Sequence, residues 1–203
     1  MEGSYMAYEA KDFSRLLGTK GFSDQLLQNH FKLYQGYVTN TNKLVDALMG
    51  MVKEGKAATP EFAELKRRFG WEWNGMRLHE LYFENMSKTP KPLSPSSALA
   101  KKMAENLGSV EARMNAFVAV GSMRGIGWVV MYYDPVGKRL FNQWINEHDV
   151  GHLAGCEPLL IMDVFEHAYM LDYGLAKADY IKAFMEAVEW NVVEKRFEKL
   201  GEE

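Results

Sequence analysis

The sequence has almost no cysteine and no marked excess of charge. Its 203 residues include one cysteine, Cys156, which excludes a disulfide framework and any zinc or iron–sulfur site built from cysteines. Lys and Arg number 24 against 27 Asp and Glu, and a net charge of −3 argues against a nucleic-acid-binding protein that works through bulk charge. Five histidines and the carboxylates remain as candidate metal ligands.

Long apolar runs and a secretory signal are also lacking. No stretch approaches the ~18 apolar residues of a membrane-spanning helix, and acidic residues come early in place of an apolar signal segment. We therefore expect a cytoplasmic protein that binds neither membrane nor nucleic acid. Met1–Tyr5 resembles a leader ahead of a start at Met6, a point that the sequence leaves open. With 47% apolar and 25% charged residues, the chain has the composition of a globular protein.

The first part of the chain carries helical patterns. Ser23 is a suitable cap for a long helix whose apolar stripe continues to Gly55. Thr59 and Pro60 then predict a short helix that ends near Gly70, and a further helical stretch carries residues 75–86. Helices joined in this way pack by their apolar faces, which favours an antiparallel hairpin.

The second part mixes helices and strands. The segment 87–97 holds three of the six prolines and predicts a linker at 89–96 between domains 1–88 and 97–203. Beyond it the patterns predict helices at 97–107 and 109–122, strands at 125–133, 138–145 and 158–164, and a final helix at 177–199. The expected fold is α+β: an N-terminal helical hairpin domain, then an α/β domain with a small three-stranded antiparallel sheet.

The histidines differ in their surroundings. His30 and His79 lie on apolar helix faces, where a lone histidine is usually a satisfied core residue. His148 and His152 have the spacing of half a zincin motif, but the glycines around them predict a loop where that motif needs a helix. None of the five follows a glutamate by three residues, which excludes a dinuclear carboxylate bundle.

Asp163 and His167 are more informative. Asp163 ends an apolar run, and a buried carboxylate there requires a cation or hydrogen-bond donors. Together with His167, four residues later, it offers the oxygen and nitrogen ligands that suit a divalent or trivalent metal. The alternative, that Asp163 caps the following turn, is equally consistent with the sequence.

The segment DVFEHAYMLDY at 163–173 resembles the metal-binding segment of the iron/manganese superoxide dismutases, which usually reads DVWEHAYY. The resemblance extends from about Phe22 to Phe197 and includes, in family order, His30 before YVTNTNKL, the LHELYFENM helix, the Gly127-Trp128 strand and the Trp190 segment. It implies a mononuclear metal, iron or alternatively manganese, with His30, His79, Asp163 and His167 as ligands and solvent in the fifth position. The metal would cycle between +3 and +2 and convert superoxide to O2 and H2O2.

The resemblance also assigns residues around the metal. Tyr37 matches the family's gateway tyrosine. The family's solvent-bonding glutamine comes from the second helix, where this chain has Gly75, or from the sheet, where alignment places His148. A histidine there resembles a branch that uses iron or either metal, so we expect His148 to bond the solvent or Tyr37; Gln143 and His152 are alternatives. His30 lies one residue closer to Tyr37 than usual, as the absence of a π-bulge would explain.

Further positions bear on assembly and on the pocket wall. Glu166 matches a glutamate that reaches the opposite subunit's ligand histidine, which implies a homodimer or a dimer of such dimers. Tyr34 replaces the gateway histidine, and Tyr169 corresponds to its partner from the other subunit. The pocket wall has Phe165 in place of the usual tryptophan and includes Trp128, and Lys177 stands near the expected substrate funnel. The alternative to an enzyme is a non-catalytic metal-binding dimer of the same fold.

Overall fold

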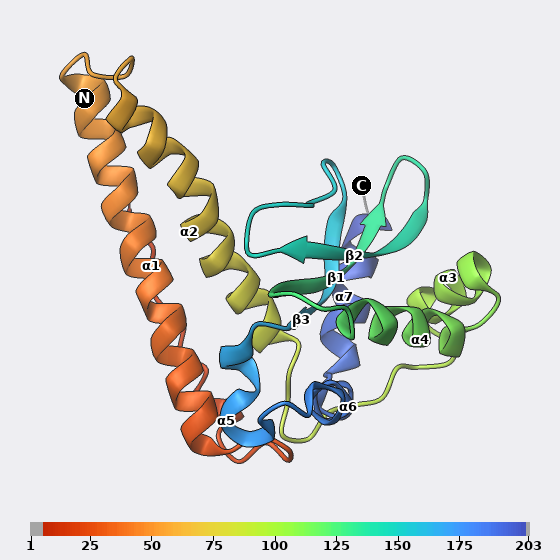
Figure 1. Ribbon diagram of the computed structural model, residues 1–203. Coiled ribbons are helices and arrows are strands. Elements are labelled where there is room, and N and C mark those ends of the chain that lie inside the picture. Colours follow the sequence, from red (N-terminus) through yellow and green to blue (C-terminus); the bar gives the residue numbers. More distant parts are fainter. Residues whose placement is uncertain (1–5, 202–203) are drawn as a thin grey trace.

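The computed structural model describes residues 6–201, so Met1–Tyr5 lies outside the described residues. Two long helices, α1 (Asp24–Lys53) and α2 (Pro60–Glu84), run side by side as a hairpin on one side of the molecule (Figure 1). The Ser23 hydroxyl caps α1 by accepting a hydrogen bond from the N–H of Leu26. None of the described helices is long and apolar enough to cross a membrane.

The α2 helix corrects the prediction of a short helix that ends near Gly70. Residues 60–84 form one continuous helix, and the Asn74 side chain donates to the Gly70 carbonyl inside it. An internal glycine costs a helix only about 1 kcal/mol relative to alanine. Packing against α1 outweighs that cost, and α2 therefore reaches the sheet with His79 in its last turns.

The remaining elements surround a three-stranded antiparallel sheet, as expected. Its strands are β1 (Gly127–Asp134), β2 (Arg139–Asn146) and β3 (Glu157–Asp163), and β1 lies in the centre of the order β2-β1-β3. Helices α3 (Ala98–Leu107) and α4 (Val110–Gly121) precede it (Figure 1). After it come α5 (Met170–Tyr173), α6 (Lys177–Ala187) and α7 (Trp190–Glu198), with short 3-10 turns at Ser14–Leu16 (η1), Glu166–Ala168 (η2) and Lys199–Gly201 (η3).

The predicted single helix at 177–199 is wrong, because the chain breaks it into α6 and α7. Val188 is extended and forms a bridge with Met86, while the N–H of Ser87 donates to the Ala187 carbonyl. These bonds tie the end of α6 to the chain that follows α2. Sequence periodicity cannot detect such a pairing, because the two segments are about a hundred residues apart.

Between Glu84 and Ala98 the chain forms no helix and no strand beyond that bridge, but the division into domains there stays a prediction. One buried cluster includes side chains from both halves, such as Leu27 and Phe83 before this segment and Trp128 and Phe184 after it. Asn85 also joins the halves: its side chain bonds both the N–H and the carbonyl of Ile161 in β3. The end of α2 is thereby held against the strand that ends in Asp163.

Candidate metal centre

Four side chains from four elements meet at the junction of the hairpin and the sheet. His30 comes from α1, His79 from α2, Asp163 from the last position of β3 and His167 from η2. Asp163 lies opposite Trp128 in the sheet register, which fixes its place at the edge nearest α2. His30, His79 and Asp163 are buried, and the His167 side chain keeps 28% of its exposure.

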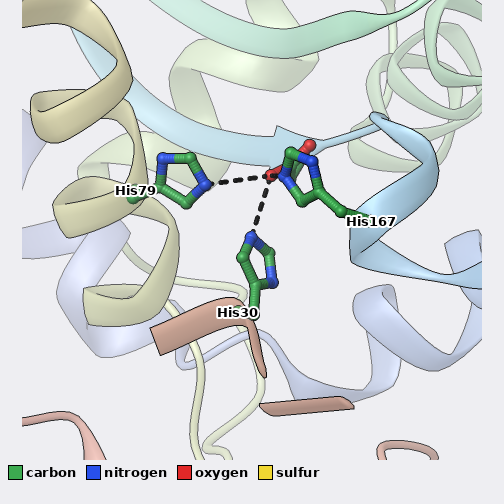
Figure 2. Close-up of side chains that lie close together, drawn as sticks. His30, His79 and His167 are labelled. Carbon is green, nitrogen blue, oxygen red and sulfur yellow. Dashed lines mark hydrogen bonds and ion pairs between the residues drawn. The ribbon is translucent and has the colours of Figure 1, made fainter. Parts of the chain in front are cut away.

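The three imidazoles point toward a single carboxylate oxygen (Figure 2). The Oδ2 atom of Asp163 lies 3.1 Å from Nε2 of His30, 3.0 Å from Nε2 of His167 and 3.6 Å from Nε2 of His79. One ligand atom from each residue falls within 4.8 Å of all the others. The structure thus brings together all four residues that the resemblance proposes as ligands.

His79 shows what this cluster requires. Its Nδ1 lies 2.6 Å from the carbonyl oxygen of Gly75, and a carbonyl only accepts, so Nδ1 carries the proton. In the neutral ring Nε2 is then an unprotonated acceptor, and it has no hydrogen-bond partner within residues 6–201. An acceptor nitrogen that faces a carboxylate oxygen at the centre of a protein needs a cation between them.

The charges of the cluster favour the same conclusion. Burial lowers the pKa of His30 and of His79, which keeps both rings neutral. Burial alone would raise the pKa of the Asp163 carboxyl, but His167 and His30 outweigh it and hold that pKa below its usual range. Three imidazole nitrogens and one carboxylate oxygen suit iron or manganese, so the residues fit a mononuclear redox metal.

The two carboxylate oxygens of Asp163 face different groups. While Oδ2 faces the imidazoles, Oδ1 accepts from the N–H of Phe165 at 2.9 Å and so caps the turn that leads to His167. The backbone carbonyl of Asp163 accepts from the hydroxyl of Tyr180 on α6. These bonds fix the carboxylate in one orientation.

A directed chain of hydrogen bonds lies beside the cluster. Trp128 Nε1 is 3.0 Å from Nδ1 of His148, and Nε2 of His148 is 2.8 Å from the Tyr37 hydroxyl. Because the indole N–H only donates, Nδ1 of His148 accepts and the neutral ring carries its proton on Nε2. That proton is donated to Tyr37, which leaves the hydroxyl hydrogen of Tyr37 free for another acceptor.

Gly75 makes room for Tyr37. A Cβ atom added at Gly75 would lie 2.5 Å from Cδ1 and 2.7 Å from Cε1 of the Tyr37 ring. The ring stacks on His79 with centroids 5.2 Å apart. The residue that stands in place of the family's helix glutamine therefore lets Tyr37 lie between a proposed ligand and His148.

The alternatives to His148 are engaged elsewhere. The Gln143 amide donates to the carbonyl of Trp144 in its own strand. His152 lies 2.8 Å from the Tyr132 hydroxyl through Nδ1 and 2.8 Å from the His148 carbonyl through Nε2, so it holds the loop that carries His148. This supporting role of His152 has no signal in the sequence beyond its spacing from His148.

Aromatic rings form the wall between His148 and the cluster. The Phe165 ring stacks on His148 at 4.7 Å and on His167 at 5.0 Å between centroids. Trp128 packs edge-on against His79 at 4.8 Å. Trp71, which the sequence did not single out, lies 4.5 Å from His148 and donates from its indole to Glu147. Its only sequence signal is the aromatic-rich stretch Trp71–Trp73.

Tyr34 and Lys177 make other contacts. The Tyr34 hydroxyl donates to a carboxylate oxygen of buried Glu80 and accepts from the N–H of Lys11, although its ring lies 6.4 Å from that of His79. The Lys177 ammonium donates to the Met123 carbonyl and lies over the Trp144 ring.

The residues that the resemblance places at a subunit contact lie just beyond the cluster. Glu166 is exposed on η2, and Tyr169 is buried with its ring stacked on Tyr180 at 5.4 Å. Around them Met170, Leu171 and Leu175 are 40%, 57% and 92% exposed.

Acid is expected to destabilise the fold through His148. Burial lowers its pKa from 6.5 to about 4, so between these values the unfolded chain binds a proton that the folded chain does not. Stability is complete above pH ~6.5 and falls as pH falls through this window, by about 2 kcal/mol for this group from pH ~7 to ~5. Urea unfolding of the metal-free protein at these two pH values measures this loss of unfolding free energy. The His148→Gln variant should lose about 2 kcal/mol less, and an equal loss would contradict the prediction.

The helical hairpin and sheet, with three imidazoles and a carboxylate at their junction, form a site that could hold a single metal ion. The model of the family described as iron/manganese superoxide dismutases, C-terminal domain, matches residues 95–196. The chain is 35% identical over 196 residues to a superoxide dismutase [Fe] of Aquifex pyrophilus, covering 94% of this chain and 91% of the relative. It is 35% identical over 181 residues to a superoxide dismutase [Mn] 2 of Haloferax volcanii, covering 89% of each.

A superoxide dismutase [Fe] of Cupriavidus metallidurans is 35% identical over 182 residues, covering 87% of this chain and 89% of the relative. The chain belongs to the iron/manganese superoxide dismutase family. The family prediction from DVFEHAYMLDY is thereby confirmed, and so is the α+β fold.

Proposed function

We propose that this protein is a superoxide dismutase that acts through a single ion held by His30, His79, His167 and Asp163. The convergence of these four residues on one point carries the proposal, and the names of the relatives support the activity. When bound, the metal supplies reversible one-electron transfer, by which one superoxide is oxidised to O2 and a second, with two protons, is reduced to H2O2. His167, the most exposed of the four, marks the side open to solvent.

The chain's own residues hold the protons. Burial and the nearby carboxylates of Asp163 and Glu72 raise the pKa of Tyr37, so its hydroxyl keeps its hydrogen at neutral pH. Because His148 donates to the oxygen of that hydroxyl, the hydrogen itself points to another acceptor. We propose that this acceptor is solvent or substrate at the metal, and that Trp128 and His148 are positioning residues that set this direction.

Two variants of His148 test the direction of the hydrogen bonds from Trp128 through His148 to Tyr37. Glutamine keeps an acceptor for Trp128 and a donor for Tyr37, whereas leucine leaves both partners unpaired. We expect His148→Gln to retain most of the turnover. For His148→Leu we expect a loss of about ten- to a hundredfold while the metal stays bound, because outer hydrogen bonds tune a metal site by that much. Stopped-flow superoxide decay together with metal analysis measures both, and equal rates for the two variants would contradict the assignment.

Iron is the proposed metal, with manganese as the alternative. Relatives named for iron and for manganese are equally similar to this chain. The observation that favours iron is that His148, not glutamine, bonds Tyr37, which resembles the branch that uses iron or either metal. Dismutation rates of the protein loaded with each metal test this. A higher rate with manganese would reverse the assignment.

The dismutation rates of the iron-loaded and manganese-loaded protein also test the alternative function, a non-catalytic metal-binding dimer. The unusual surroundings of the cluster, with Gly75, His148 and Tyr34, favour this alternative. Full occupancy by iron or manganese without dismutation would establish it. We further propose that the protein works in the cytoplasm, which rests on its single cysteine.

We also propose a homodimer, or a dimer of such dimers, in which Glu166 reaches the partner's ligand histidine. Its carboxylate is exposed and makes no hydrogen bond or ion pair to any residue that the structure describes. The exposed Met170, Leu171 and Leu175 give the same segment an apolar surface suited to a subunit contact. Tyr169 and Tyr34 would lie near this contact.

Glu166→Ala should weaken the dimer. Removing one partner of a buried charged hydrogen bond costs about 2–5 kcal/mol at an interface. Sedimentation velocity at falling concentration should therefore show monomer for Glu166→Ala where the wild type is still a dimer. Glu111→Ala serves as the control, because Glu111 is also an exposed carboxylate but lies on α4. An unchanged profile for Glu166→Ala would count against the bridge.

A further inference from the structure

A second polar site lies away from the metal cluster. A cavity of about 840 Å³ opens between α3, α4 and the hairpin of β1 and β2, and no proposed metal ligand lines it. Its walls include four cationic side chains, Lys102, Arg113, Lys138 and Arg139, and one carboxylate, Glu105. Such a wall suits an anion.

Arg113 is the central feature of this cavity. The residue is 4% exposed, and its Nε has no hydrogen-bond partner in the described chain. Burial lowers the pKa of its guanidinium, and no neighbouring carboxylate opposes that effect. A buried arginine is normally paired, because a buried charge without a partner is strongly unfavourable.

Arg196 shows how this chain satisfies a partly buried arginine that has a structural role. Its guanidinium bonds the carbonyls of Leu81 and Leu159 and the carboxylate of Glu84. Arg113 has no comparable set of acceptors within residues 6–201, although it faces a cavity large enough to admit one. The Arg113 guanidinium therefore lacks an anionic partner, and the cavity has room for one.

Asn142 ties Arg113 to the sheet beside the cavity. Its side-chain Nδ2 donates to the backbone carbonyl of Arg113, and Asn142 lines the same cavity. The wall therefore offers mainly arginine and lysine donors. A phosphate group, with up to two negative charges and several acceptor oxygens, suits such donors.

The rim supplies further charge and some apolar surface. Lys102 is paired with Glu105 at 2.7 Å, but the exposed Lys138 and Arg139 form no ion pair with the described residues. Beside them Phe141 is 41% exposed and could cover an organic group attached to a phosphate.

We propose that this cavity binds a phosphate group, either free phosphate or the phosphate monoester of a small organic molecule. Arg113 donates to its oxygens from the guanidinium group, and the cationic side chains of the rim balance its charge. The site is separate from the dismutase centre, and its failure would leave the proposed function intact.

Calorimetric titration of the metal-loaded protein tests this with inorganic phosphate and a nucleoside monophosphate as probes. We expect phosphate to bind and Arg113→Met to weaken it about tenfold or more, as expected for loss of charge-assisted hydrogen bonds. If Arg113→Met does not fold, Arg139→Gln on the exposed rim of the cavity is tested in its place. This variant should weaken phosphate binding about threefold. Lys101→Met removes an exposed charge outside the cavity and should change nothing.

The outcomes separate the sources of the phosphate. Tighter binding of the nucleoside monophosphate indicates an organic ligand, and equal binding indicates the free ion. The proposal is overturned if no phosphate binds, or if Lys101→Met weakens binding as much as the cavity variants.

Discussion

Replacing Asp163 with asparagine is expected to leave the folded protein without its metal. The amide has the size of the carboxyl and can still accept from the N–H of Phe165, so the turn before His167 is kept. The amide brings no negative charge to a point that three imidazoles surround. A buried multivalent cation there would lack its only anionic ligand, and we expect its affinity to fall more than the ten- to hundredfold typical of an outer residue.

Metal content by mass spectrometry and superoxide decay by stopped flow measure this effect. For Asp163→Asn both should fall to background, while circular dichroism shows a folded chain. Asp179→Asn is the matched control, since Asp179 is an exposed carboxylate in the first turn of α6. Full metal content in Asp163→Asn would refute the proposed ligand set.

Gly75→Ala is expected to separate metal binding from turnover. The added methyl would overlap the Tyr37 ring, whose Cδ1 lies 2.5 Å from the Cβ position, so the ring must shift and its hydrogen bond with His148 is disturbed. The carbonyl of residue 75 still accepts from His79, so that ligand keeps its orientation. Overpacking of this kind costs about 1–3 kcal/mol of stability. We expect bound metal, a lower unfolding free energy and turnover reduced about tenfold or more, as for lost outer-shell contacts.

Gly70→Ala provides the control on the same helix. A Cβ atom at Gly70 meets no other atom within 4 Å, so the substitution should stabilise α2 by up to about 1 kcal/mol and leave turnover unchanged. Thermal unfolding and superoxide decay of the two variants measure both effects. Gly75→Ala with wild-type stability and rate would show that Tyr37 tolerates displacement.

Helix starts and strands could be predicted from the sequence because their signals are local. Ser23 caps α1, Ser97 caps α3 and Ser109 caps α4, each with its side chain on the N–H three residues later. Gly70 and the 177–199 helix were misjudged because the deciding contacts are distant. In α2 these contacts are with α1, and at Val188 they are with Met86.

The site could be predicted only in part. Asp163 and His167 are close in sequence, but nothing local shows that His30 and His79 join them; only the family resemblance brought the four together. The position of Tyr37 against Gly75, the proton direction set by Trp128 and the support from His152 depend on contacts between different elements. Arg113 appears in the sequence as an ordinary helix residue, since its lack of a partner exists only in the folded chain.

The central claim is that one redox metal lies among His30, His79, Asp163 and His167. Anomalous diffraction from crystals of the protein, recorded on both sides of the iron and manganese absorption edges, tests it most directly. We predict one strong peak bounded by the three Nε2 atoms and Oδ2 of Asp163, with the iron edge dominant. A metal-containing protein with its peak elsewhere, or with no iron or manganese signal at this point, would contradict the account.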